Sequence, residues 1–345
     1  MLESQTEVVM RWLRVRSRGA LMVFALAIMA YCVNAYAVHW QRCAGTPDIF
    51  DLTQHVLQGT APSPYQSQMY VSARVVNGIA VVMRPPVEAV LRRPISDGEA
   101  VDIGYWLFYN GGTVLFLIAM MRVCALVAGD LAAAIACLFL VGVYPLFWFD
   151  NEFHPSDPYG CLLAALVMDR LVRKGTDGGY VALLFLSGFF WEKHLFIPLC
   201  VAVLQLLQRR PFLKVILTAA VGLGASMIGQ IIPRLLYPGS KSLVFGWQPL
   251  AANIVGIRWF VLWAAILYGF QLWAVIRRDS SVPPIWRVMA LQFLIWPIVY
   301  FVEGGLISEM RATMIMVPLT WPILALVINE ALGRKAPSVG AEAIP

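Results

Sequence analysis

The chain is a series of apolar runs of about 20 residues, separated by short clusters of arginine and lysine. A helix of this length crosses the hydrocarbon core of a bilayer. Sixty per cent of the residues are hydrophobic and 13% are charged, whereas about a quarter are charged in a typical soluble domain. The sequence therefore predicts an all-α, polytopic integral membrane protein, with about ten transmembrane helices.

The basic clusters predict how these helices are oriented, because Lys and Arg accumulate on the cytoplasmic side of a membrane. Four arginines precede the first apolar run, which covers about residues 20–39. We interpret it as an uncleaved signal anchor, and the alternative is a secretory signal cleaved at Ala35-Tyr36-Ala37. Later clusters fit one alternation of spans when they are all placed inside: Arg173 and Lys174, Arg209 to Lys214, Arg277 and Arg278, Arg334 and Lys335. This map puts both termini in the cytoplasm, and we expect a bacterial inner membrane.

One domain accounts for nearly the whole chain. Residues 1–335 are predicted to form a single transmembrane domain, and residues 336–345 a disordered cytoplasmic tail. A long exported loop, residues 40–101, contains an apolar piece at 71–83 that is too short to cross and carries Arg74 and Asn77, so we expect an interfacial helix there. Two runs of about 14 residues flank Glu192-Lys193-His194, which predicts a hairpin with its charged tip near or below the outer interface.

Several other features exclude function classes. The net charge of +6 is explained by topology, so we predict no nucleic-acid partner. Apart from Cys43 the cysteines lie in apolar runs without metal spacing, which is typical of small core residues. His39, His55, His154 and His194 share the outer face with many carboxylates, yet no metal-binding spacing is present. Mg²⁺, held by carboxylates and a substrate phosphate, is the one cofactor left open.

Four groups of ionisable residues fall on the predicted outer face. They are Asp48 with Asp51, the loop from Asp150 to Asp157, the Glu192-Lys193-His194 tip, and Glu309 with Arg311. Charges at membrane depth are costly, so a buried cluster indicates a functional site. The alternatives are a solvated acidic loop for 150–157 and a snorkelling helix-end arginine for Arg311. The tip is the hardest to explain in this way, because its flanking runs are too short to lift it into water.

The order of these motifs resembles the GT-C superfamily of membrane glycosyltransferases. Asp48 and Asp51 follow the first span and precede Leu57-Gln-Gly59 and Pro64-Tyr65, Asp157-Pro-Tyr159 leads into a span that ends in basic residues, Glu192 lies on a short hairpin, and Glu309-Met-Arg311 precedes the last span. The chain departs from the commonest pattern of that family because it lacks an Asp-Glu doublet after span one and a soluble C-terminal domain. The acceptor class therefore stays open.

The resemblance implies transfer of a sugar from a polyprenyl-phosphate donor to a lipid or glycan acceptor on the outer face. Such a reaction needs a carboxylate that takes the proton of the acceptor hydroxyl, for which Asp48 and Asp51 are the candidates, and cations that stabilise the departing phosphate. Lys193 and Arg311, with Arg74 or Arg258 as more distant candidates, supply the cations. The remaining substrate-binding candidates are Tyr65, Asp157, Glu192, His194 and Glu309, while Trp191 and Trp247 are candidates for packing against sugar or lipid.

Two other function classes remain open. A transporter or flippase for a lipid-linked or anionic solute is expected to have broken helices and repeated halves, and only the broken hairpin at Glu192 fits. A non-catalytic subunit of a membrane complex would use a close-packing face, for which Gly222, Gly224 and Gly229 on one span are candidates. Internal packing is the simpler explanation of those glycines.

Overall fold

The computed structural model describes residues 17–42, 67–143, 156–190, 192–238, 269–270, 272–273, 276, 286 and 317–334. These residues form helices and turns and no strand, as the sequence predicts. In chain order the helices are α2 (Arg18–Arg42), α4 (Ser67–Leu91), α5 (Asp97–Ala128), α6 (Asp130–Val143), α7 (Asp157–Lys174), α8 (Gly178–Gly188), the 3₁₀ helix η3 (Glu192–Leu195), α9 (Phe196–Leu207), α10 (Phe212–Leu236) and α13 (Val317–Ala331). The predicted tail, 336–345, lies outside the described residues.

Three of the described helices are long and apolar enough to cross a membrane. They are α2, α5 and α10, and each lies where a span is predicted. The shorter apolar helices are α6, α8, α9 and α13. On α2 the exposed side chains include Met22, Leu26, Met29 and Val33, which are 58% to 69% exposed. Because these four repeat every three or four residues, one apolar face of α2 is left uncovered by protein, as a lipid-facing helix requires.

Contacts between helix ends show which of these ends lie on the same side of the bundle. The backbone N–H of Ser17, just before α2, donates to Asp130 at the α5–α6 turn across 3.1 Å. Arg122 near the end of α5 pairs with Asp169 near the end of α7 at 3.6 Å. Gly222 of α10 lies against Leu184 of α8, and Gly229 farther along α10 lies against Phe185 and Gly188, so α8 and α10 run in the same direction. We call the end that holds these starts and turns, near residues 17, 129, 175 and 210, the basic end.

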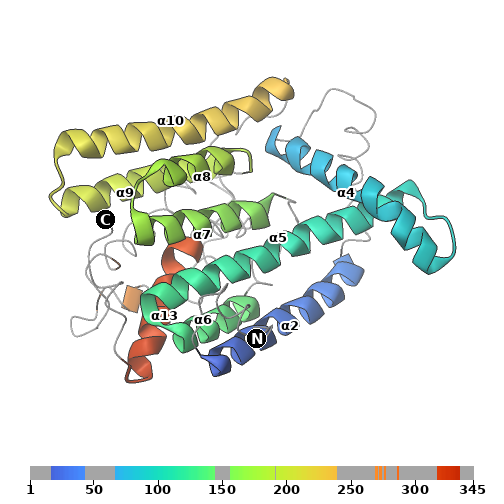
Figure 1. Cartoon of the computed structure of the whole chain (residues 1–345), viewed down its shortest axis with the longest axis horizontal. Coiled ribbons are helices and arrows are strands. Elements are labelled where there is room, and N and C mark those ends of the chain that lie inside the picture. The colour runs from blue at the N-terminus through green and yellow to red at the C-terminus, as the bar shows by residue number, and fades with distance from the viewer. Residues whose placement is uncertain are drawn as a thin grey trace, which may run out of the picture.

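The opposite end is covered by α4. Figure 1 shows α4 where α5 begins and α10 ends, lying across the first part of α5. A Cβ on Gly104 of α5 would lie 2.6 Å from the carbonyl oxygen of Val76, so glycine lets the two backbones touch. Tyr70 stacks on Tyr237 just past α10, with ring centroids 5.1 Å apart. The predicted helix at 71–83 is therefore present but longer, because it continues through Pro85 and Pro86 to Leu91.

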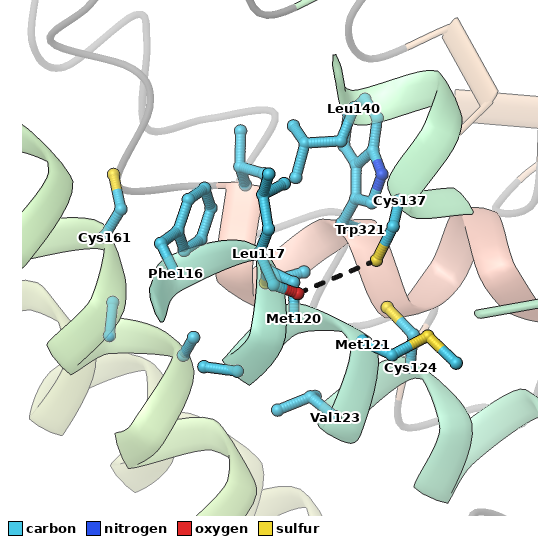
Figure 2. Packing of buried hydrophobic residues seen from close by; sticks show 14 of the residues in the cluster. Phe116, Leu117, Met120, Met121, Val123, Cys124, Cys137, Leu140, Cys161 and Trp321 are labelled. Atoms are coloured by element: carbon cyan, nitrogen blue, oxygen red, sulfur yellow. Dashed lines mark hydrogen bonds between the residues drawn. The ribbon is translucent and has the colours of Figure 1, made fainter. Parts of the chain in front are cut away.

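A tightly packed core lies between α5, α6 and α13 (Figure 2). The indole N–H of Trp321 donates to the carbonyl of Ala136 across 2.8 Å, and the thiol of Cys137 lies 3.9 Å from the carbonyl of Leu117. Cys124, Cys137 and Cys161 are buried and Cys200 is partly buried, as expected of core residues. For Cys32 that expectation is wrong, because it faces outward from α2, which packs against the bundle along one side only.

Candidate functional site

Only part of the predicted site lies in the described residues. Asp48, Asp51, Tyr65, Glu309 and Arg311 lie outside them, as do Trp191, Trp247 and Arg258. For Glu192 and Lys193 the structure describes the backbone, which forms η3. Asp157 and His194 are described in full, and both are buried. The geometry around these two residues is therefore the test of whether separate outer loops converge.

Asp157 is the first residue of α7. The helix begins here because Pro158 follows, and proline fits the first turn, where a backbone N–H has no helical partner. A carboxylate in this turn interacts favourably with the positive end of the helix dipole. The Asp157 side chain nevertheless lies almost entirely inside the protein, at 6% exposure. An acidic group in this position is costly unless it is paired or used.

The imidazole of His194 joins the start of α7 to the end of α8. Its Nε2 lies 3.0 Å from the carbonyl oxygen of Gly160, and its Nδ1 lies 3.1 Å from the carbonyl oxygen of Ser187. We call this pair of contacts the His194 bridge. Gly160 is one helical turn after Asp157, so the bridge places the η3 tip beside the predicted substrate-binding carboxylate. Two loops that the sequence singled out separately are thus brought together.

The two carbonyl contacts make the number of hydrogen bonds depend on the protonation of His194. A carbonyl oxygen only accepts hydrogen bonds, and a neutral imidazole donates through one nitrogen only. Both contacts are hydrogen bonds when the ring carries two protons. His194 is 0% exposed, and an imidazolium at the last turn of α8 interacts favourably with the negative end of that helix. An imidazolium thus makes both hydrogen bonds of the bridge, and a neutral ring makes one of them.

An aromatic stack supports the same region. The Tyr159 ring lies 4.2 Å from Phe108 of α5 and 5.5 Å from Phe190 after α8, centroid to centroid. The Tyr159 hydroxyl donates to the carbonyl of Phe108 across 2.9 Å. A Cβ on Gly112 would lie 2.7 Å from the Tyr159 ring, so the start of α7 reaches α5 because residue 112 is glycine. The stack holds the start of α7 in place.

Glycines set the position of α8 against α10. A Cβ on Gly188 would lie 2.5 Å from the carbonyl oxygen of Ser226, and one on Gly229 would meet the carbonyl of Phe185. Gly222 packs against Pro198 and Leu184, whereas Gly224 has open space beside it. The glycines at 222 and 229 therefore serve internal packing. Their close contacts place Ser187, and with it His194, at a fixed depth in the bundle.

Helix lengths give the distance of the bridge from the basic end. At 1.5 Å per residue, Gly160 lies about 21 Å along α7 from Lys174, and Gly229 lies about 26 Å along α10 from its start. The hydrocarbon core of a bilayer is about 30 Å thick. The bridge thus lies just short of one bilayer thickness from the basic end. With 32 residues, α5 extends about 48 Å and continues beyond the bridge to reach α4.

Several other charged groups form ion pairs near the two ends of the bundle. At the α4–α5 turn, Arg84 contacts Glu88 at 3.0 Å and Asp97 at 2.7 Å, and Arg93 contacts Glu99 at 2.6 Å. The pKa of Glu99 is lowered to about 2, most strongly by the hydrogen bond from Arg93 and then by those from the N–H and hydroxyl of Ser96. Between α7 and α8 the Arg170 guanidinium lowers the pKa of Asp177 to about 2. These acids stabilise turns, and Arg74, the more distant phosphate candidate, stays exposed on α4.

The described part of the candidate site can be compared with the requirements of a metal-binding site. Among the described residues, no three His, Cys, Asp or Glu side chains come together as metal ligands. In the His194 bridge each ring nitrogen faces a carbonyl oxygen, so neither offers a lone pair to a metal. A role for Mg²⁺ stays a prediction that concerns carboxylates outside the described part of the chain.

Comparison with known proteins adds no relative. No family model, curated protein or solved structure matches this chain. The site is therefore interpreted from its own residues.

Proposed function

We propose that the chain is a membrane glycosyltransferase of the GT-C type, which transfers a sugar from a polyprenyl-phosphate donor to an acceptor on the periplasmic face. The observation that carries the proposal is the His194 bridge, because it joins the Asp157 and Glu192-Lys193-His194 motifs at one place. Both motifs belong to the resemblance described above. Their convergence supports one site rather than separate solvated loops.

The proposal includes an orientation in the membrane. The basic end, where Arg18, Lys174, Arg209 and Arg210 are exposed, faces the cytoplasm in accordance with the positive-inside rule. The His194 bridge then lies just inside the outer interface, and α4 lies at that interface as a cover. A lipid-linked donor reaches this depth from the outer leaflet without leaving the membrane. Ten spans with both termini inside complete this topology.

In the proposed sugar transfer, the acidic, basic and sugar-binding residues have different roles. The acceptor oxygen attacks the anomeric carbon of the sugar, the bond from that carbon to the phosphate oxygen breaks, and polyprenyl phosphate leaves. Asp48 or Asp51 takes the proton of the acceptor hydroxyl. Lys193 and Arg311 stabilise the charge that develops on the phosphate, and the His194 imidazolium adds to this positive potential. Asp157, Glu192, Glu309 and Tyr65 bind and orient the sugar.

Transfer of radiolabelled sugar in isolated membranes tests the proposal. Membranes that carry the wild type are supplied with polyprenyl-phosphate-linked sugars, and the Asp48→Ala/Asp51→Ala double variant is assayed beside them. We expect incorporation into lipid or glycan by the wild type and a loss of at least a hundredfold in the variant, which is within the range of general-base catalysis. Wild-type membranes that transfer none of the donors would overturn the assignment, and undiminished transfer by the variant would remove these residues as the base.

The same membranes test the second candidate, a transporter or flippase. The observation that favours it is the broken hairpin, in which α8 and α9 have 11 and 12 residues and are interrupted by η3. A transporter moves a lipid-linked sugar across sealed vesicles without forming a new glycosidic bond. Donor that changes leaflet but is recovered chemically intact supports the transporter, and a labelled product supports the transferase.

A further inference from the structure

The turn between α9 and α10 has an unusual backbone. Gln208, Arg209, Arg210 and Pro211 connect the two helices. The N–H of Arg209 donates to Leu206 O at 2.9 Å and the N–H of Arg210 donates to Gln205 O at 3.0 Å, which is the Schellman pattern that ends many helices. Arg209 occupies its left-handed position with φ 57°. Glycine is the usual residue there because it has no Cβ, so an arginine at this position has a strained backbone.

The basic residues of this turn lie at the surface of the described part of the protein. Arg209, Arg210 and Lys214 are all exposed, and none has an ion-pair partner among the described residues. Nearby at the basic end, Arg122 and Arg173 share Asp169, and Arg170 pairs with Asp177. Residues 193–278 contain nine Lys and Arg and no Asp or Glu. The protein thus presents a concentrated positive charge on this turn without an acidic residue nearby in sequence.

Apolar surface flanks the turn on both sides. Leu206 and Leu207 at the end of α9 are 45% and 59% exposed, and Phe212 and Leu213 at the start of α10 are 67% and 70% exposed. Ile216 and Leu217 continue this surface along α10. A ligand that matches the whole region needs a negatively charged head and long apolar chains. An anionic phospholipid has both.

We propose that the α9–α10 turn binds the headgroup of an anionic phospholipid, whose acyl chains lie along the exposed faces of α9 and α10. Arg209 and Arg210 offer planar guanidinium groups that match a phosphate, and Lys214 adds a third charge one turn into α10. This site is separate from the sugar-transfer proposal and does not depend on it.

Native mass spectrometry of the full chain in detergent micelles tests the site. The probes are phosphatidylglycerol and phosphatidylcholine with identical acyl chains. The test variant is Arg209→Gln/Arg210→Gln/Lys214→Gln, and the matched control is Arg18→Gln/Lys174→Gln/Arg334→Gln, which removes three exposed charges elsewhere. Each basic residue near an anionic lipid strengthens binding about fivefold, so we expect the Kd for phosphatidylglycerol to rise on the order of a hundredfold in the test variant and by less than about threefold in the control.

Two results would overturn the proposal. One is equal weakening in both triple variants, which would show general attraction between a basic protein and an acidic lipid. The other is equal binding of the two lipids by the wild type. The single variant Arg209→Gly keeps the test open if the triple variant does not insert: we expect a higher melting temperature without lipid, because the backbone strain is relieved, and about fivefold weaker binding of phosphatidylglycerol. Unchanged binding by this variant would also contradict the proposal.

Discussion

The α4–α5 turn and the His194 bridge both concentrate charged or polar groups, yet they lie in opposite environments. At the turn, Arg84, Glu88, Arg93 and Glu99 are partly exposed and bind one another. At the bridge, His194 and Asp157 are buried inside the protein. Exposed pairs contribute little to stability, whereas buried ionisable groups are costly to keep. We therefore expect the turn to tolerate substitution, and the buried groups of the bridge are those for which we propose a functional role.

The largest effect on stability is expected from a substitution at the bridge, compared with one at the α4–α5 turn. In His194→Phe the two contacts to Gly160 and Ser187 are lost. We expect the free energy of unfolding to fall by about 3 kcal/mol, because buried carbonyl oxygens that lose a hydrogen-bond partner cost roughly 1–3 kcal/mol each. Unfolding by a denaturing detergent measures it. Glu99→Gln at the turn serves as the control, with a smaller loss, and a larger loss in the control than in His194→Phe would reverse the comparison.

The glycine contact beside the bridge offers a matched pair of substitutions. Gly188→Ala puts a Cβ 2.5 Å from the Ser226 carbonyl, so α8 must move away from α10, and we expect a loss of about 1–3 kcal/mol. Gly224→Ala on α10 has open space and is expected to stabilise by about 0.5–1 kcal/mol, because alanine favours the helix. Thermal melts in micelles compare them. Equal effects at the two positions would show that α8 and α10 are not held in close contact.

The smallest effect is the pH dependence of the α4–α5 turn. The pKa of Glu99 is about 2 in the folded protein and about 4.3 in an unfolded chain. A group whose pKa is lowered by folding adds stability above its unfolded pKa and loses it as the pH falls through the folded value. We expect the melting temperature of the wild type to fall more steeply between about pH 4.5 and 2 than that of Glu99→Gln. Parallel curves would show that the Arg93–Glu99 pair adds no stability.

The positions of the main helices could be predicted from the sequence because length and apolarity decide them. The observed α2, α5 and α10 cover three of the roughly ten predicted spans, and the two short runs around Glu192 do form α8 and α9 on either side of η3. The end of α4 was predicted less well. Pro85 and Pro86 are typical helix breakers, yet the helix continues for one more turn, to where Arg84 and Glu88 contact the start of α5.

The His194 bridge could not be predicted in the same way. Its partners are backbone carbonyls, and Gly160 lies 34 residues away in the chain. Backbone acceptors carry no residue signature, so no spacing in the sequence marks them. The histidines give no signal as a group, but the position of His194 on a tip too short to leave the membrane does single it out. The glycines at 112 and 188 are a second signal in the sequence, because they permit the close contacts of α5 with α7 and of α8 with α10.

The same chemical change made in each region tests most directly whether the bridge marks the functional site. Asp157→Asn and Asp97→Asn each replace a carboxylate with an amide, the first buried beside the bridge and the second exposed at the α4–α5 turn. Sugar transfer from the polyprenyl-phosphate donor is measured in membranes with equal amounts of each folded protein. We predict a loss on the order of a hundredfold for Asp157→Asn and a change of less than about twofold for Asp97→Asn. Full transfer by Asp157→Asn, or an equal loss in both variants, would contradict the account.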